Sequence, residues 1–274
     1  MMRIYLEGVG LYGPGMEGWT HAKEVLAGRA EHLPGPATLP PSPLLPANER
    51  RRAPKIVKIA LAAGAEAFTA AGRDPAHTPA IFASSGGDGD TIHDILNALA
   101  SPQRELSPTK FHNSVHNAAA GYWSIATGAT SALTSLCAHD GSFAAGLLEA
   151  ATQAAALGEA VALIAYDVPY PAPLSAVRPI GAAFGAALVL SPSPSTAGFA
   201  RLGLTLLPGS HAPSPAASPA LEQLRRTTPA ARCLPLLAAL ADDVAAAVAL
   251  DYLEDMALML NIAPRPAAGW QDPA

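Results

Sequence analysis

The stretch TSLCAHDGSFAAGLLEA, residues 134–150, places a thiol between two segments of different character. Residues 131–136 are strand-like, and residues 142–157 carry the small and apolar side chains of a long helix. Cys137 therefore falls at a strand-to-helix turn, near unpaired backbone N–H groups and the positive end of a helix dipole, which favour a thiolate. Asp140 opposes this by adding negative charge nearby. The alternative is a buried cysteine that packs as a small hydrophobe.

Outward from this turn, short apolar runs alternate with amphipathic segments. The runs at 160–165 and 185–190 show no alternation, as in strands that are covered on both faces. A glycine turn at 86–90 precedes a helix that Asp90 or Thr91 is expected to cap. The other expected elements are strands at 3–11, 79–84 and 200–207 and helices at 19–27, 54–71, 91–100 and 113–126. This order predicts an α/β fold, a layered mixed β-sheet with helices on both faces.

Two segments interrupt this pattern. Residues 33–48 contain six prolines and no charged side chain, which predicts an irregular surface loop. Residues 208–219 are rich in Pro and Ser and are expected to be a linker between a domain at 1–207 and a C-terminal extension at 220–274. Within the extension, residues 244–262 form either one helix or a β-hairpin that turns at 253–255. The hairpin is favoured because two apolar stretches lie symmetrically about an acidic turn.

Composition excludes several classes of protein. Half of the residues are hydrophobic and 14% are charged, so the chain can bury a large core. The net charge is -5 and no Lys/Arg run is interleaved with aromatics, so nucleic acid is not an expected partner. Glu7 interrupts the N-terminal apolar run, and no later stretch offers about 18 uncharged apolar residues, so we expect a cytoplasmic protein with no membrane contact. The two cysteines, Cys137 and Cys233, make no disulfide framework.

Three other motifs have weaker chemical meaning. His112 and His116 are four residues apart and could share a helical face as metal ligands, but no Glu of a His-Glu-x-x-His pattern lies between them. A polar cluster at a helix start is the favoured interpretation, and no metal is expected. Residues 86–90 lack the Lys-Ser/Thr ending of a P-loop, so no cofactor is expected either. Residues 84–85 lack the Gly-x-Ser-x-Gly elbow of a serine hydrolase.

These motifs together resemble the β-ketoacyl synthase family of the thiolase superfamily, over roughly residues 1–206. The match is carried by the elbow at 137–138, the helix at 146–150, the strand at 157–163, the strand and glycine loop at 80–87 and the helix at 107–128. More narrowly, FHNSVHNAAAGYW at 111–123 is similar to the short synthase-like subunits of bacterial aryl-polyene pathways, which are chain-length-factor-like partners of a full ketosynthase.

The resemblance implies half of a thiolase-like fold with Cys137 at the nucleophile position. It also exposes a departure, because full ketosynthases are longer and take two catalytic histidines from their second half. After Cys137 this chain has only His139 and His211, and neither matches the family's histidine motifs. The implied function is a partner subunit in aryl-polyene or fatty-acid-type polyketide biosynthesis that cannot condense by itself, pairs with a full-length ketosynthase, and meets an acyl carrier protein through that complex. The implied interface residues are Asn113, His116, Asn117, Tyr122, Trp123, Ser131, Leu133 and Ser135.

Two other functions stay open. The chain could be a self-sufficient acyltransferase or thioesterase with Cys137 as nucleophile and His139 as base. It could also be a homodimeric carrier-protein binder without chemistry, and a homodimer of the isolated chain is compatible with each of these functions.

Overall fold

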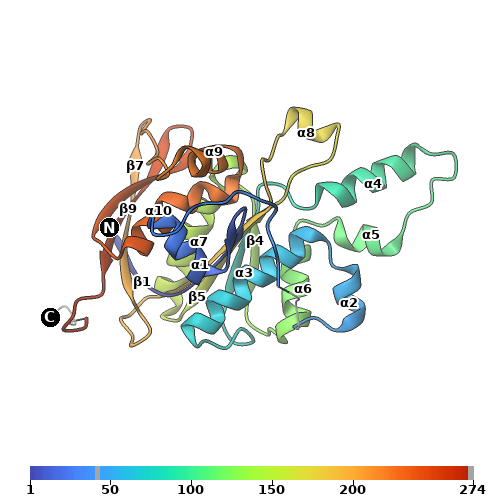
Figure 1. Cartoon of the computed structure of the whole chain (residues 1–274). Helices are drawn as coiled ribbons and strands as arrows, with labels where there is room; N and C mark the ends of the chain where they lie inside the picture. Colours follow the sequence, from blue (N-terminus) through green and yellow to red (C-terminus); the bar gives the residue numbers. More distant parts are fainter. Residues whose placement is uncertain (41–43, 271–274) are drawn as a thin grey trace.

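The computed structural model describes residues 1–40 and 44–270, which form a nine-stranded sheet with helices on both of its faces (Figure 1). The strand order is β4-β3-β5-β6-β1-β7-β9-β8, and β2 pairs with β1 alone. The strands are β1 (Met2–Gly13), β2 (Met16–Glu17), β3 (Ala80–Ala83), β4 (Leu133–Leu136), β5 (Val161–Asp167), β6 (Phe184–Ser191), β7 (Ala200–Pro208), β8 (Ala246–Leu253) and β9 (Met256–Pro264).

The α-helices are α1 (Trp19–Leu26), α2 (Ala47–Arg52), α3 (Lys55–Ala71), α4 (Gly89–Ala100), α5 (Pro108–Asn113), α6 (Ala118–Thr127), α7 (Ser142–Leu157), α8 (Leu174–Val177), α9 (Pro219–Thr227) and α10 (Leu234–Asp242). Two 3-10 helices, η1 (His139–Gly141) and η2 (Pro229–Cys233), precede α7 and α10. No described helix is both long enough and apolar enough to cross a membrane.

The sheet is mixed, as the sequence predicts. β3 runs parallel to both β4 and β5, while every other pairing is antiparallel. Consecutive residues of a strand point to opposite faces, so Leu163 joins the core under α1, α7 and α10 while Ile164 joins the core under α3 and α6. Both faces of β5 and β6 are therefore covered, which explains their uninterrupted apolar sequences.

Most predicted elements are confirmed within a few residues, including the 142–157 helix and the hairpin, which is β8 and β9. Residues 33–40 have no regular structure, as expected, and residues 41–43 of that loop lie outside the described residues, as do 271–274 of the C-terminal extension.

The predicted 113–126 helix is confirmed over 118–126 as α6, but its predicted start is wrong, because a turn at 114–117 separates α5 from α6. Tertiary hydrogen bonds hold this turn: Asn113 Nδ2 donates to the carbonyl of Arg52 at 3.1 Å, and His116 Nε2 lies 3.1 Å from the carbonyl oxygen of Ser84. These partners lie 61 and 32 residues away in sequence, so helical spacing alone cannot reveal the break.

The predicted caps of the 91–100 helix are also wrong. α4 begins at Gly89 with Asp88 at its N-cap position. The buried Asp88 side chain accepts a hydrogen bond from the hydroxyl of Thr91 at 2.5 Å. Thr91 thus lies inside the first turn, where its side chain contacts the residue that precedes the helix.

The two edges of the sheet differ. Along β8, Ser214 of the Pro/Ser-rich segment donates its N–H to the carbonyl of Ala249 at 2.9 Å, and its Oγ accepts the N–H of Ala249 at 3.0 Å. β4 pairs only with β3 in the part of the chain that the structure describes. Because the Ala132 and Leu136 carbonyls accept bonds from β3, the alternate residues Leu133 and Ser135 direct their backbone groups outwards.

Candidate active site

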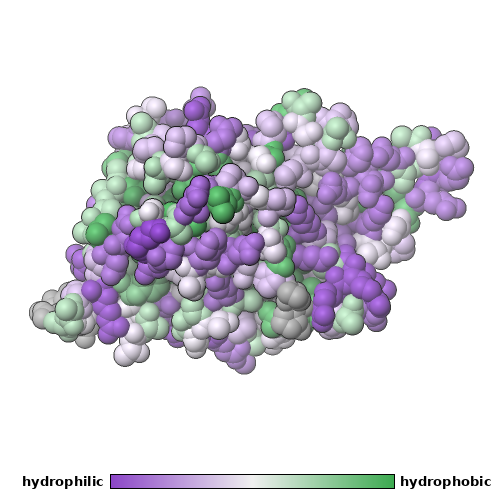
Figure 2. All heavy atoms as spheres, in the orientation of Figure 1, coloured by the Kyte–Doolittle hydropathy of each residue, from purple (hydrophilic) through white to green (hydrophobic). Residues whose placement is uncertain are grey.

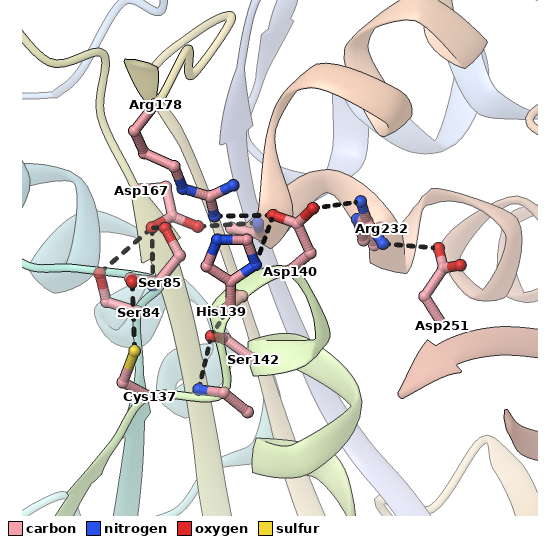
Figure 3. Close-up of polar contacts among 12 residues, drawn as sticks. Ser84, Ser85, Cys137, His139, Asp140, Ser142, Asp167, Arg178, Arg232 and Asp251 are labelled. Carbon is pink, nitrogen blue, oxygen red and sulfur yellow. Dashed lines mark hydrogen bonds and ion pairs between the residues drawn. The ribbon is translucent and has the colours of Figure 1, made fainter. Parts of the chain in front are cut away.

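The elbow lies where the parallel strands end. β3, β4 and β5 point the same way, so the residues that follow their carboxyl ends meet at one edge of the sheet. Ser84 and Ser85 follow β3, Cys137 follows β4, and Asp167 ends β5 (Figure 3).

Asp167 connects the residues at the carboxyl ends of these strands, and it was not predicted from the sequence as a site residue. Its fully buried carboxylate accepts the N–H of Ser85 at 2.9 Å, the hydroxyls of Ser85 and Ser84 at 2.8 and 3.2 Å, and the N–H of Ala230 at 2.9 Å. Burial raises the pKa of Asp167, and these hydrogen bonds partly offset that rise. The one available signal was an acidic residue at the end of the otherwise apolar run 161–166.

Cys137 is exposed, so of the two interpretations of this residue the alternative of a buried cysteine that packs as a small hydrophobe is wrong. Its Sγ donates a hydrogen bond to the carbonyl oxygen of Ser85, with a sulfur–oxygen distance of 3.1 Å (Figure 3). A carbonyl oxygen has no proton to give, so it can make this bond only with a protonated thiol. The turn at 137–141 is the predicted strand-to-helix elbow. The Cys137 thiol in it donates its hydrogen to the Ser85 carbonyl oxygen.

His139 does not contact the thiol, so the prediction that it acts as the base for Cys137 finds no support in the geometry. Its backbone has a φ of 50°, and its side chain is 72% exposed. Its Nδ1 lies 3.7 Å from Asp140 Oδ1, and Figure 3 shows the ring turned towards Asp140 while the sulfur faces Ser85. The positive φ directs the side chain away from the elbow, which spacing in sequence could not indicate.

Asp140 is bound by two arginines and does not act as a free charge beside the thiol. Its carboxylate oxygens lie 2.6 Å from Arg178 and 2.9 Å from Arg232, and Arg232 also reaches Asp251 at 3.1 Å (Figure 3). Burial raises the pKa of Asp140, but Arg178 and Arg232 outweigh it and hold that pKa below its ordinary value. The carboxylate thus fixes the elbow to the C-terminal part of the chain.

A cleft of about 660 Å³ lies beside the elbow. His139, Asp140 and Arg232 line one part of it, and His211 and Glu254 line another. The structure therefore brings together the two histidines that follow Cys137, although they are 72 residues apart (211 − 139). His211 Nε2 lies 3.0 Å from the Pro208 carbonyl oxygen, and Cys137 does not line the cleft.

Three of the expected interface residues are buried within the chain, which corrects that expectation. Trp123 is 0% exposed and packs against Phe68 and Phe82. The Tyr122 hydroxyl donates to Asn113 Oδ1 at 3.0 Å, and both side chains are buried. These side chains support the core under α6 and cannot touch a partner directly.

The other expected interface residues stay accessible to different degrees. Asn117 is exposed and His116 is half-buried, with its ring nitrogen beside the Ser84 carbonyl. Ser131, Leu133 and Ser135 are half-buried on or next to the open edge strand. His112 packs against the ring of Tyr122 with centroids 6.0 Å apart, and the turn at 114–117 keeps it off any helical face shared with His116.

The family model described as the beta-ketoacyl synthase N-terminal domain matches residues 21–246. Among solved structures, similarity extends to a ketosynthase (ApeO) in complex with its chain length factor (ApeC) from Xenorhabdus doucetiae, with a TM-score of 0.71, 18% identity, and coverage of 96% of this chain and 100% of that chain.

A structure described as a type II PKS acyl-carrier protein in complex with its ketosynthase (AntDE:AntF) gives a TM-score of 0.72 at 13% identity, with coverage of 96% of this chain and 99% of the matched chain. The ishigamide ketosynthase/chain length factor gives 0.68 at 12% identity, with coverage of 96% and 99%. No curated protein sequence matches this chain. The solved structures share its fold, and by the match over residues 21–246 the chain belongs to the β-ketoacyl synthase family.

Proposed function

We propose that this chain is a chain-length-factor-like subunit that pairs with a full-length ketosynthase in aryl-polyene or fatty-acid-type polyketide biosynthesis, and that it does not condense by itself. The observation that carries this proposal is the elbow. The thiol at the family's nucleophile position donates a hydrogen bond to the Ser85 carbonyl oxygen, and the His139 side chain is turned away from the thiol.

The chemistry of condensation explains why this matters. The reaction needs a thiolate to take up the acyl group and positioned donors to stabilise the charge that develops when CO₂ is lost. The only later histidines in this chain are His139 and His211, which lie on the separate cleft. A thiol without those groups permits acylation at most, so we expect elongation to depend on a partner.

The open edge of β4 supports this kind of partner. Strand edges with free backbone groups pair readily with another strand unless they are covered, and the segment around Ser214 covers β8 but not β4. Two subunits of one fold that meet through the same strand about a two-fold axis pair it antiparallel. α4 and α5 form an arm that projects from the rest of the chain (Figure 1), and α6 contacts β4. Exposed apolar side chains lie on this arm, in the turn after it or on α6, namely Ile92, Leu96, Leu99, Phe111, Val115 and Ile125. The solved relatives ApeO and ApeC likewise form a complex of ketosynthase and chain length factor.

We propose that the acyl carrier protein reaches this chain only through the complex, in the cytoplasm. A basic run at 50–58, with Arg50, Arg51, Arg52, Lys55 and Lys58 all exposed, offers positive charge for an acidic partner on a chain of net charge -5. Figure 2 shows a strongly hydrophilic surface over α2, which carries the three arginines.

The decisive experiment mixes the chain with a candidate full-length ketosynthase and measures mass in solution by light scattering. A heterodimer, together with elongation that requires both subunits, supports the proposal. A mixture that stays monomeric contradicts it. Condensation of malonyl and acyl thioesters by the isolated chain, abolished by Cys137→Ala, would establish the self-sufficient enzyme instead.

A strand variant tests the edge itself. Ser135→Pro removes an outward-pointing N–H, which an edge strand tolerates, so the isolated chain should fold while the heterodimer is lost. Thr134→Pro is the matched control, because it removes an N–H directed at β3 and should destabilise the isolated chain. Unchanged heterodimer formation by Ser135→Pro would exclude β4 as the pairing strand.

A further inference from the structure

The segment 168–183, which joins β5 to β6 and carries α8, lies against the elbow. At its far end, Arg178 lies 2.6 Å from Asp140, and Gly181 donates its N–H to the carbonyl of Thr227 at 2.8 Å. At its near end it continues directly from the buried Asp167. Because both ends are anchored, the segment presents Tyr170 at a defined place.

Tyr170 packs against the glycine turn. A methyl group at Gly86 would collide with the Tyr170 hydroxyl, and one at Gly89 would collide with the ring. Neither glycine has a left-handed φ, so the closeness of Tyr170, and not backbone conformation, is what demands glycine at these two positions.

Ser85 lies between the buried Asp167 and the Gly86 that Tyr170 packs against. Asp167 holds it from inside, through the Ser85 N–H and hydroxyl at 2.9 and 2.8 Å. Tyr170 restrains the next residue, Gly86, from outside. The peptide group between Ser85 and Gly86 carries the carbonyl that accepts the Cys137 thiol at 3.1 Å.

We propose that Tyr170 is a positioning residue that holds the Ser85 carbonyl where it accepts the hydrogen of the Cys137 thiol, and so keeps this exposed thiol unreactive in the isolated chain. The inference deepens the proposed function, because it explains how a nucleophile position stays silent. Burial raises the pKa of Tyr170, with Asp167 adding to the rise, so the ring beside the thiol is a neutral phenol near pH 7.

The test measures alkylation of the full chain by iodoacetamide at neutral pH, followed by mass spectrometry. Cys233 is fully buried, so labelling of the folded protein reports Cys137, and Cys137→Ser gives the blank. Tyr170→Ala should be labelled about tenfold faster, because the Ser85 carbonyl moves and the Cys137 thiol loses its hydrogen-bond acceptor. Tyr170→Phe removes the hydroxyl that packs on Gly86 but keeps the ring against Gly89, so its labelling rate should fall between those of wild type and Tyr170→Ala.

Gly86→Ala provides a second route to the same displacement, since the new methyl group forces the Tyr170 hydroxyl away. It should also speed labelling, and on the Tyr170→Ala background it should add nothing, because the collision partner is gone. Gly121→Ala, with open space around its Cβ position, is the matched control and should match wild type.

Wild-type labelling rates in both Tyr170→Ala and Gly86→Ala, or independent addition of their effects, would overturn the inference. Labelling of Cys233 would reveal an unfolded Tyr170→Ala, in which case Gly86→Ala decides. Heterodimer formation is measured separately from labelling of Cys137. A negative labelling result therefore leaves the proposed function unaffected, and a mixture that forms no heterodimer leaves the inference about Tyr170 unaffected.

Discussion

Asp140 shows how one side chain links the elbow to a distant part of the chain. It pairs with Arg178 and Arg232, whose side chains are 22% and 18% exposed. Asp140→Asn removes the carboxylate that pairs with Arg178 and one of the two carboxylates that pair with Arg232, which keeps Asp251. We expect the free energy of unfolding to fall by about 1–2 kcal/mol. Thermal unfolding followed by circular dichroism measures this loss, with the exposed Asp255→Asn as a control that should change little.

The pH dependence of this effect has a definite sign. The pKa of Asp140 in the folded chain lies below its ordinary value of 3.8, so the carboxylate stabilises the fold above that value and the contribution disappears as pH falls through the lower, folded pKa. The difference in melting temperature between wild type and Asp140→Asn should be constant near neutral pH and shrink below about pH 4. A difference that grows on acidification would contradict this assignment.

Trp123 is the residue whose role changes most between sequence and structure. Its side chain fills the core under α6, so Trp123→Ala should lower the stability of the isolated chain by about 3–5 kcal/mol. Phe111→Ala is the comparison, because Phe111 is 65% exposed and its loss should change stability by less than about 0.5 kcal/mol. Denaturant titration separates the two, and equal effects would place Trp123 outside the core.

At the scale of elements, the Pro/Ser-rich segment acts as the cover of an edge strand. Ser214→Pro removes both the N–H and the hydroxyl that bond Ala249 on β8, which uncovers its backbone groups. We expect the solution mass to rise with concentration beyond that of wild type, as measured by light scattering. Ser214→Ala keeps the backbone bond and should have a smaller effect, whereas wild-type behaviour of the proline variant would mean that other contacts protect β8.

At the scale of the whole molecule, the divisions at residues 207 and 219 do not coincide with separate cores. β9 pairs with β7 along nine residue positions, and Leu234, Leu237 and Leu258 share one core with Leu163. We therefore propose that a chain ending at residue 207 fails to fold cooperatively, as followed by urea unfolding, and that co-expression with residues 209–274 restores it. Cooperative unfolding of the short chain at the midpoint of the full chain would instead establish an independent domain at 1–207.

Local pattern by itself determined the elements and the elbow. The apolar runs of β5 and β6, the small residues of α7 and the acidic turn between β8 and β9 each encode their own structure, because helix and strand periodicity and turn chemistry act over a few residues. The same local reading located Cys137 between a strand and a helix, and its surroundings carried the resemblance to the ketosynthase family.

Only the tertiary structure decided what the elbow can do. Asp167 gathers donors from positions 63 to 83 residues away, Ser85 presents the acceptor for the thiol, and a positive φ turns His139 aside. Tertiary packing also decides that Trp123 lies in the core and that Leu133 lies on the open edge strand β4. Hydrogen-bond partners and burial depend on which distant segments meet, and that is a property of the assembled sheet, to which the spacing of residues along the chain gives no access.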